Sequence, residues 1–483
     1  MSTDRPSPRR PAILVAATHS GAGKTTATGV VLRALRRRGL EPQPFKLGPD
    51  FIDAAYHAEA TGRPAINLDV WMMGVDGVRE SYRRWSSDAD VSVIESMGAL
   101  YDGADGGEHG SAAHVAKLLG VPVVVVLDVW GMTRTSAAIL EGLRAFDPAV
   151  HIAGCILNRV GGAAHAEMVM EALPRPLREL VVGAIERRPE LEIPERHLGL
   201  VTVEENPTAR AAREEASVRA SELIDVEGLV GIAGIAAAPA GGMGRSASVG
   251  RSVPASSAPP SATPSGGAPP SATPGARLAI ARDRAFCFYY EENLLLLRDA
   301  GFELVPFSPT SDPRLPANVD AVYIGGGYPE SFAPELEANG SLAAELRERT
   351  AGGMPLYAEC GGLVYLARSL TGFDGVRREL SGVLPVDVVM DPDRLAIRYV
   401  EVRTRVESPL GEAGTVARGQ EFHQSHIVRA DVEPTLYDVE TSTGETYRDG
   451  YLARGVAASY THLHFASCPA LVSSLMRAAV ARR

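Results

Sequence analysis

Residues 12–26 read AILVAATHSGAGKTT, and this stretch decides the fold of the first half of the chain. The apolar run Ala12–Ala17 predicts a strand, and the pattern over residues 23–38, closed by Gly39, predicts a helix. Glycines in the turn between them let the backbone approach a phosphate closely, and the N–H groups of the helix N-terminus converge on it. We therefore expect a loop that binds ATP and Mg²⁺, formed by Ser20, Gly21, Gly23, Lys24, Thr25 and Thr26.

Two side chains of this loop carry the expected chemistry. Lys24 would neutralise the β- and γ-phosphates, and the hydroxyl of Thr25 would reach Mg²⁺. Lysine occurs only three times in the chain, so a lysine in a glycine-rich loop is a specific signal. The common phosphate-loop pattern has Gly where this chain has Thr18, so the loop is a variant. A chance glycine-rich turn is the alternative interpretation.

Apolar runs alternate with helical patterns through the rest of the first half. This alternation predicts a parallel sheet wrapped by helices, because parallel strands need helical crossovers. The further predicted strands are Val91–Glu95, Val121–Leu127, His151–Leu157 and Leu180–Ile185.

Charged side chains follow the predicted strands at the edge where ligands bind in such sheets. A second strand leads into Phe45–Asp53, and we expect Lys46, Asp50 and Asp53 to share one loop there. Glu95 ends the strand Val91–Glu95. Each acidic residue taken alone is more often a solvated turn residue, but their placement after successive strands predicts a metal site of Thr25, Asp50 and Glu95.

The chain changes character over residues 236–276, which are Ala, Pro, Ser and Gly with almost no apolar bulk. Such a segment cannot bury enough surface to offset its ordering entropy, so we expect a disordered linker. It would separate a nucleotide-binding domain, residues 1–235, from a second domain, residues 277–483. Predicted strands resume at Arg277–Ala281, Glu303–Phe307, Ala321–Ile324 and Pro355–Ala358, with helices at Glu292–Ala300 and Pro334–Arg349.

A second site is predicted around Cys360, which follows a strand and precedes Gly361, Gly362 and a helix expected from Leu363. A thiol on such a sharp turn is exposed at the sheet edge, and the helix N-terminus favours its thiolate. The pattern indicates a nucleophile, with a buried structural cysteine as the alternative. A cysteine nucleophile needs a base, and we expect His462, with His464 as the alternative.

Two further patterns accompany the cysteine. Residues 325–327 are three glycines after a predicted strand, and their backbone N–H groups could stabilise an oxyanion. A zinc site is a weaker interpretation of the remaining ligand-type residues: His423, His426, His462, His464 and Cys468.

Composition excludes several classes of protein. The 483 residues suggest two to four domains, and 45% hydrophobic and 22% charged residues are ordinary for a globular protein. A net charge of −11 argues against a nucleic-acid partner, and no apolar run is long enough to predict a membrane span. The four cysteines are far apart, which favours a reducing cytoplasm over a disulfide framework.

The motifs together resemble those of the cobyrinate a,c-diamide synthases. The loop around Lys24, the segment Phe45–Asp53 and residues 95–103 are similar to the dethiobiotin-synthetase-like ATPase half of that family, over nearly all of residues 11–230. Residues 281–293, the Cys360 turn and Gly419–Ser425 are similar to its glutamine amidotransferase half, over most of residues 277–470. The resemblance implies two doubly wound α/β domains, a P-loop NTPase-like parallel sheet followed by a class I glutamine amidotransferase-like sheet.

The resemblance also implies roles for individual residues. Asn158 would face the adenine, and Gly326, Gly327 and Gly361 would form the oxyanion site. The substrate would contact Lys46, Asp50, Asp53 and Asp102. Triad amidotransferases usually carry Glu two residues after the catalytic His, where this chain has His464, and this fits the family branch that works with a Cys–His pair.

The implied reaction joins the two sites. ATP would activate the a and c acetate carboxylates of cobyrinate or hydrogenobyrinate as acyl phosphates, and L-glutamine would supply ammonia. A cytoplasmic enzyme is expected, with a homodimer as the candidate assembly. The alternatives are an amidotransferase for another tetrapyrrole, such as a cobyric acid synthase or a nickel-sirohydrochlorin a,c-diamide synthase, and a ParA-like ATPase switch with an inactive thiol domain.

Overall fold

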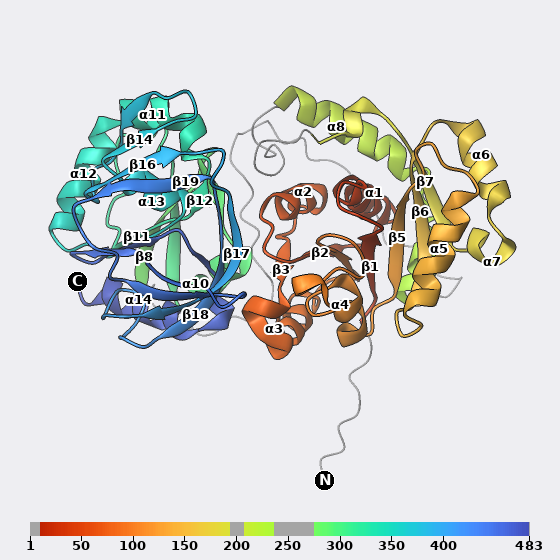
Figure 1. The fold of residues 1–483 in the computed structure, drawn as a ribbon, viewed down its shortest axis with the longest axis horizontal. Coiled ribbons are helices and arrows are strands. Elements are labelled where there is room, and N and C mark those ends of the chain that lie inside the picture. The colour runs from red at the N-terminus through yellow and green to blue at the C-terminus, as the bar shows by residue number, and fades with distance from the viewer. Residues whose placement is uncertain (1–9, 194–206, 236–274, 483) are drawn as a thin grey trace, which may run out of the picture.

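The computed structural model describes residues 10–193, 207–235 and 275–482, which form two α/β units lying side by side (Figure 1). The predicted linker falls almost wholly on residues 236–274, which lie outside the described residues. Both units are built on central sheets, as predicted from the alternation of apolar runs with helical patterns.

The first unit contains a seven-stranded sheet in the order β3-β2-β4-β1-β5-β6-β7, with every neighbouring pair parallel. Its central strands are buried on both faces, as a parallel sheet between helices requires. The strands are β1 (Ala12–Ala17), β2 (Pro42–Leu47), β3 (Ile66–Leu68), β4 (Val91–Glu95), β5 (Val123–Asp128), β6 (Ile152–Val160) and β7 (Val181–Glu186).

Helices cover both faces of this sheet. One apolar layer joins the sheet to α1 (Lys24–Arg37), α2 (Ile52–Thr61), α8 (Pro207–Ser221) and α9 (Val226–Ala233). The opposite layer joins it to α3 (Val70–Trp85), α4 (Ala112–Leu119), α5 (Thr135–Phe146), α6 (Ala163–Ala172) and the short α7 (Arg175–Arg178).

The second unit has a six-stranded sheet in the order β10-β8-β11-β13-β23-β22, parallel except for the edge strand β22. Its strands are β8 (Ala276–Ala281), β10 (Phe302–Phe307), β11 (Ala321–Ile324), β13 (Leu356–Glu359), β22 (Tyr451–Ala453) and β23 (Val456–Ser459). Its helices are α10 (Glu291–Asp299), α11 (Ala333–Ala338), α12 (Gly340–Ala351), α13 (Gly361–Leu366) and α14 (Ala470–Val480).

The second unit also contains antiparallel sheets that the sequence patterns did not predict. One has the order β15 (Arg377–Glu379), β14 (Ser369–Thr371), β16 (Val386–Met390) and β19 (Ser425–Ala430), with only its β14–β16 pair parallel. Another has the order β21 (Thr446–Asp449), β20 (Tyr437–Thr441), β17 (Ala396–Thr404), β18 (Val416–His423) and β24 (His462–Leu463). A two-stranded sheet pairs β9 (Phe286–Phe288) with β12 (Gly326–Gly327). The single helix expected over Pro334–Arg349 is wrong, because Asn339 has non-helical dihedral angles and separates α11 from α12.

Direct contacts fix the orientation of the two units. The Tyr399 hydroxyl donates to the Asp69 carboxylate at 2.6 Å, and the Trp71 ring stacks on Tyr399 with centroids 5.0 Å apart. Ser81 donates to the Glu292 carboxylate at 3.0 Å. Burial raises the pKa of Asp69 above its ordinary value, as expected of a carboxyl group enclosed between two units. These contacts hold the two units in one relative orientation.

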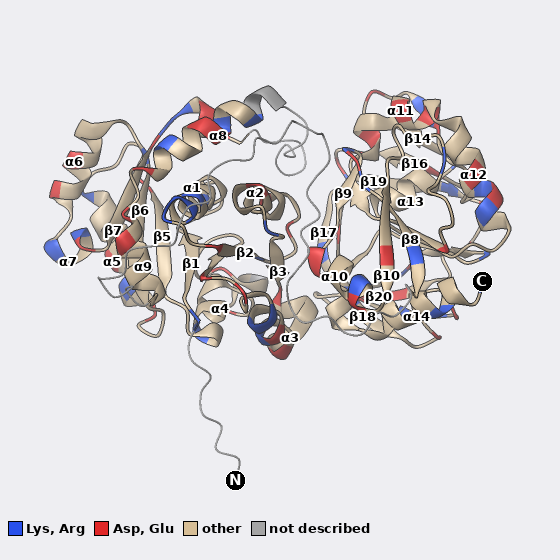
Figure 2. Ribbon diagram, turned by 180° about the vertical axis from the view of Figure 1, so that it is seen from behind, with Lys and Arg blue, Asp and Glu red and all other residues tan. Residues whose placement is uncertain are grey.

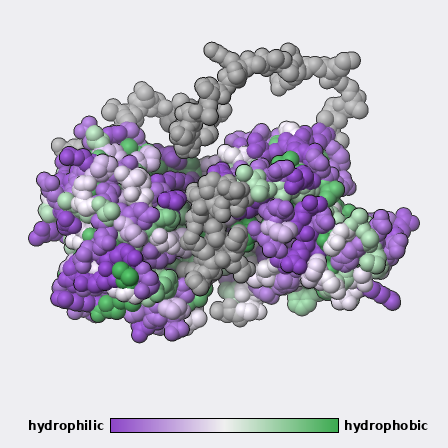
Figure 3. Space-filling model, turned by 90° about the horizontal axis from the view of Figure 1, so that it is seen from above, coloured by the Kyte–Doolittle hydropathy of each residue, from purple (hydrophilic) through white to green (hydrophobic). Residues whose placement is uncertain are grey.

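The surface is polar and mixed in charge. Basic and acidic residues alternate along α8 and α12 (Figure 2), and hydrophilic residues predominate on the face seen from above (Figure 3). Among the described residues, none of the helices combines the length and the apolar character that crossing a bilayer would require.

Leu14→Ala tests the central role of β1. Leu14 is fully buried in the sheet core, so its truncation should lower the free energy of unfolding by about 2–5 kcal/mol. Chemical denaturation measures the change. Leu223→Ala is the control, because that side chain is 62% exposed and its loss should matter by less than about 0.5 kcal/mol. Equal stability of the two variants would contradict the assignment of β1 to the core.

Candidate active site

The predicted phosphate loop lies between β1 and α1, as expected. Gly21 and Gly23 have φ angles of 78° and 83°, in the region that favours glycine. A Cβ at Gly23 would overlap the side-chain amide of Asn158. Asn158 lies near the end of β6 and donates to the Ala22 carbonyl at 2.7 Å. Asn158 therefore braces the loop, and its contact with adenine stays a prediction.

The other predicted loop residues have defined neighbours. Lys24 is buried and its ammonium donates to the His19 carbonyl at 3.5 Å. Burial lowers the pKa of Lys24, and the charge of Glu95 partly opposes this effect. An anionic phosphate beside the ammonium would stabilise its charged form. Thr26 donates to the Leu191 carbonyl at 3.0 Å, which ties the start of α1 to the segment after β7.

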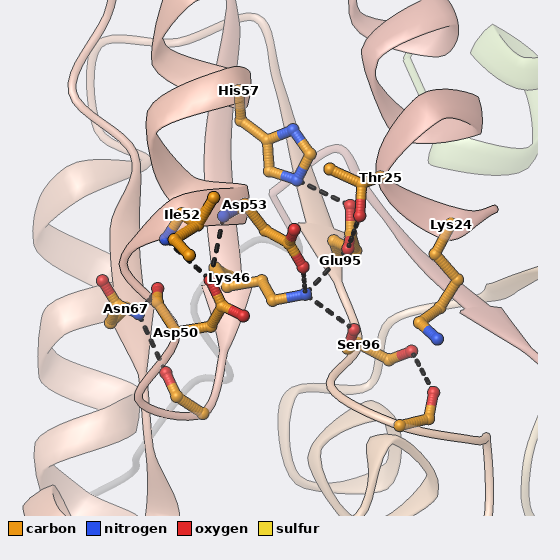
Figure 4. Close-up of polar contacts among 12 residues, drawn as sticks. Lys24, Thr25, Lys46, Asp50, Ile52, Asp53, His57, Asn67, Glu95 and Ser96 are labelled. Carbon is orange, nitrogen blue, oxygen red and sulfur yellow. Dashed lines mark hydrogen bonds and ion pairs between the residues drawn. The ribbon is translucent and has the colours of Figure 1, made fainter. Parts of the chain in front are cut away.

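A buried charge cluster lies beside the phosphate loop (Figure 4). The Lys46 ammonium is 2.6 Å from Asp53 Oδ2 and 2.7 Å from Glu95 Oε1. His57 Nε2 is 2.6 Å from the second Glu95 oxygen, and Thr25 donates to Oε1 at 3.3 Å. The cluster therefore joins the phosphate loop, the end of β4 and the first turns of α2.

Burial and the charges within the cluster shift the pKa values of its members. Burial acts to lower the pKa of Lys46, but Asp53 and Glu95 hold it well above its ordinary value. Burial acts to raise the pKa of Glu95, but Lys46 and His57 hold it well below its ordinary value. Burial, together with the charge of Asp50, raises the pKa of Asp53 to about 6. Lys46 and Glu95 are therefore a charged pair near neutral pH.

The sequence predicted most of this cluster but not its local geometry. The expectation that Lys46, Asp50 and Asp53 share one loop is wrong, because Lys46 lies in β2 and Asp53 in α2. Only Asp50 is in the connection, where its Oδ1 accepts the N–H groups of Ile52 and Asp53 at 2.8 Å each. The carboxylate of Asp50 thus caps the start of α2.

The observed cluster differs from the predicted site at two residues. Asp102 is exposed in the loop after β4 and is not among the contacts of the Lys46 cluster. His57, which the sequence analysis did not select, lies in the cluster. Its position four residues after Asp53 on α2 was the signal that could have identified it, because such spacing places two side chains on one helix face.

The cluster has the chemistry of a Mg²⁺ site. Mg²⁺ prefers oxygen ligands and keeps several waters, so one or two protein carboxylates are enough beside nucleotide phosphates. Thr25 and Glu95 already touch each other at the phosphate loop, which fits this donor set. No group of three or more His, Cys, Asp or Glu side chains is arranged to hold a metal within residues 10–193, 207–235 and 275–482, so the zinc interpretation is not supported.

Cys360 lies on a sharp turn between β13 and α13. Its φ of 48° and ψ of −104° are unusual for a residue with a side chain, and such strain is typical of nucleophile turns. The helix begins at Gly361, two residues earlier than expected. A Cβ at Gly362 would overlap the backbone of Ile324 at the end of β11, so the turn needs glycine there.

The thiol is not preactivated. Burial raises the pKa of Cys360 well above its ordinary value, and the Glu330 carboxylate adds to the rise. The Gly361 N–H acts in the opposite direction, as the sequence predicted, but its effect is smaller. A base must therefore remove the thiol proton during the reaction.

The three-glycine stretch lies against both reactive groups. Gly326 and Gly327 form β12 opposite Phe288 and Phe286 of β9, so they are a short strand rather than an open loop. A Cβ at Gly326 would overlap the His462 ring. A Cβ at Gly361, next to the nucleophile, would come within 3.0 Å of the Gly327 nitrogen.

The two histidines have different surroundings. His462 lies in β24, opposite Gln420 of β18, and its ring packs against Gly326. His464 is fully buried and its ring lies 4.9 Å from that of Tyr290, a residue that also contacts the first unit. Burial lowers the pKa of His464 to about 4. The contact with the glycine strand favours His462 as the base.

A single ring links the two sites. Phe51, between Asp50 and the start of α2, lies 5.1 Å from the His462 ring, 5.2 Å from Phe288 and 4.5 Å from Tyr290. The adjacent Pro49 carbonyl accepts the Gln420 side-chain amide at 3.1 Å. The connection that carries Asp50 in the first unit therefore packs against the base of the second.

Comparisons with known proteins match both halves of the chain. Residues 13–201 match the family model described as the CobQ/CobB/MinD/ParA nucleotide binding domain. Residues 277–470 match the CobB/CobQ-like glutamine amidotransferase domain.

Curated relatives match nearly the whole chain. A cobyrinate a,c-diamide synthase of Syntrophotalea carbinolica is 38% identical, over 95% of this chain and 96% of its own. A protein of the same name from Caldanaerobacter subterraneus is 36% identical, over 93% of this chain and 94% of its own. Another, from a Synechocystis strain, is 37% identical, over 97% of this chain and 93% of its own.

Gly326→Ala tests the contact between the glycine strand and the base. The added methyl group would overlap the His462 ring and displace it, so glutamine hydrolysis should fall about 100-fold. A steady-state glutaminase assay measures the loss. Gly340→Ala is the matched control, because its Cβ would meet nothing within 4 Å. Unchanged hydrolysis in Gly326→Ala would show that the ring can move without consequence.

Proposed function

The chain belongs to the cobyrinate a,c-diamide synthase family, and on this premise we propose that it amidates the a and c acetate carboxylates of cobyrinate or hydrogenobyrinate with ATP and L-glutamine. The observation that carries the proposal is the packing of Phe51, from the segment that holds Asp50, against His462 of the thiol site. Two unrelated activities would not need this contact, whereas a reaction that passes ammonia from one site to the other needs adjacent sites.

The second unit releases ammonia from glutamine. His462 takes the proton of the Cys360 thiol as the sulfur attacks the amide carbon, and N–H groups of Gly326, Gly327 and Gly361 would stabilise the oxyanion. The C–N bond then breaks, and His462 returns the proton to the departing ammonia. Water hydrolyses the remaining thioester and releases glutamate, which restores the thiol.

The first unit activates the acid. A substrate carboxylate oxygen attacks the γ-phosphorus of ATP, and ADP leaves. Ammonia then attacks the acyl carbon and displaces phosphate, which forms the amide. Lys24 stabilises the transferring phosphoryl group. Lys46, which donates to Glu95, is the buried cation of the adjacent charge cluster. Bound Mg²⁺ would neutralise charge on the phosphates, and Thr25, Asp50 and Glu95 would hold it.

The predicted substrate contacts remain part of the proposal. Asp50 and Asp53 flank Phe51 at the entrance of α2, and Asp102 lies in the exposed loop after β4. We place the corrin carboxylates between these two segments. The relatives' shared name favours this substrate over other tetrapyrroles and over a ParA-like switch. A homodimer and a cytoplasmic location stay predictions.

Mass spectrometry of the products tests the proposed reaction. Cobalt-containing and metal-free precursors are incubated with ATP, Mg²⁺ and glutamine, and each should gain two acid-to-amide conversions if it is a substrate. Nickel sirohydrochlorin is the competing substrate. Hydrolysis of ATP and glutamine without any amide product would overturn the proposal.

Cys360→Ala should separate the two halves of the reaction. Without the thiol, glutamine-dependent amidation should be lost, whereas amidation with a high concentration of ammonia should persist at the wild-type rate. Product mass measured with each nitrogen source checks the prediction. If both activities are lost, the thiol is needed for the fold or the division of labour is wrong.

Lys24→Ala should abolish amidation with either nitrogen source. The loss of its ammonium removes stabilisation of the transferring phosphoryl group, which should lower the rate by about 100-fold or more. Glutamine hydrolysis by Cys360 should remain measurable in the same preparation. Amidation that survives with ammonia would refute the phosphate role of Lys24.

A further inference from the structure

The carboxylate of Glu359 lies close to His462, the proposed base, although the two residues are far apart in the sequence. His462 Nδ1 lies 3.8 Å from Oε2 of Glu359, the residue directly before the nucleophile. Both side chains are almost fully buried, with side-chain exposures of 1% and 2%. Nδ1 of His462 has no hydrogen-bond partner within the described part of the chain. At 3.8 Å the contact is an electrostatic one that a small movement would convert into a hydrogen bond.

The carboxylate of Glu359 is held by three donors. The Tyr323 hydroxyl donates to Oε2 at 2.9 Å, the Leu463 N–H donates to Oε1 at 3.0 Å, and the Tyr357 hydroxyl also donates to Oε1. An ionised carboxylate accepts at both oxygens, which fits these three donors. Leu463 is the residue after the base, so Glu359 also fixes the backbone of the strand that carries His462.

Strand alternation explains why Glu359 can serve the base and Cys360 the substrate. Side chains two residues apart on a strand share a face, and Tyr357 and Glu359 point together toward Tyr323. Ala358 and Cys360 pack in the apolar layer on the other face. Nucleophile and carboxylate, although neighbours in sequence, therefore approach the histidine strand from opposite sides of the sheet edge.

The tyrosine hydroxyls and the thiol that surround Glu359 stay protonated near neutral pH. Burial is the largest cause of a raised pKa in Tyr289, Tyr323, Tyr357 and Tyr437, and the charge of Glu359 adds to each rise. The Cys360 thiol is likewise held protonated, by burial first and by nearby carboxylates second.

We propose that Glu359 is the positioning residue of the glutaminase site: it orients the His462 imidazole through Nδ1 and stabilises the imidazolium that forms when the thiol proton is transferred. This inference rests on the proposed function, and it supplies the carboxylate that triad amidotransferases place two residues after the histidine. That position is His464 here, whose ring contacts Tyr290 instead.

Glu359→Gln in the full-length chain tests the proposal. Glutamine keeps the side-chain length and an acceptor oxygen but removes the charge, so kcat/KM for glutamine should fall about 100-fold. Loss of the negative charge should also move the acidic limb of the pH profile to lower pH by about one unit, because the imidazolium loses its partner. Glu359→Asp should restore part of the rate and the wild-type limb.

Glu292→Gln is the matched control. Glu292 is also a buried carboxylate, and its Oε2 lies 3.9 Å from Nε2 of His464. If His462 is the base, Glu292→Gln should leave the pH profile of glutamine hydrolysis unmoved. A shifted profile in Glu292→Gln with a wild-type profile in Glu359→Gln would overturn the proposal and transfer the role to His464.

Two measurements separate the ways in which the test can fail. Ammonia-dependent amidation should persist in Glu359→Gln, which shows that the chain is folded. The pH dependence of Cys360 alkylation by iodoacetamide, followed by mass spectrometry, reports on the thiol when turnover is too slow to measure, and an unshifted dependence would also overturn the proposal. Absence of glutamine hydrolysis in the wild-type protein would instead reject the proposed function itself.

Discussion

The contact between the Phe51 ring and the His462 imidazole is the constraint around which the molecule is organised. It joins the segment between β2 and α2 to the strand that carries the base. The sheets of the two units are separate, and only the contact between the units brings these two rings together. The hydrogen bond from Tyr399 to Asp69 and that from Gln420 to the Pro49 carbonyl fix the same interface on either side. The segment that carries Asp50 is therefore in direct contact with the base of the thiol site.

The buried cluster of Lys46 is a network of charged side chains in contact with the phosphate loop. Burying an ion pair costs desolvation energy, which strong contacts between the charges offset. Here Lys46 lies between Asp53 and Glu95, and His57 contacts the far oxygen of Glu95. A cation bound at Glu95 would compete with Lys46 for the same oxygen. The carboxylate proposed to hold Mg²⁺ is therefore also the partner of a buried ammonium.

The central strands of the first unit and the phosphate loop were predicted well, because the residues that determine them are neighbours in the sequence. The run Ala12–Ala17 and the loop at Lys24 needed only apolar burial, glycine and a helix N-terminus, and β1 and β4 have the predicted bounds. The antiparallel sheets over residues 369–449 were not predicted, because several of their strands have only three to five residues and many of their residues are partly exposed. Glu359 and His57 were not predicted, since each acquires its partner only when separate strands and helices meet. The sequence analysis correctly grouped Lys46 with Asp53, but it placed Lys46 in a loop rather than in β2. A buried lysine in a strand is stable only beside carboxylates, and the sequence pattern could not position those carboxylates.

The charge of Glu359 raises the question of why a carboxylate beside a thiol does not suppress the reaction. A negative charge opposes the thiolate, and it also favours the imidazolium that receives the proton. The balance depends on distance and burial: Glu359 lies 3.8 Å from His462 Nδ1, whereas burial and Glu330 affect the thiol more than Glu359 does. In the proposed role, Glu359 stabilises the imidazolium that receives the proton from sulfur. The thiol stays protonated at rest, and the nucleophile forms as the base takes the proton. The Phe51 ring lies 5.1 Å from the same imidazole, so the segment that carries Asp50 forms part of the surroundings of the base.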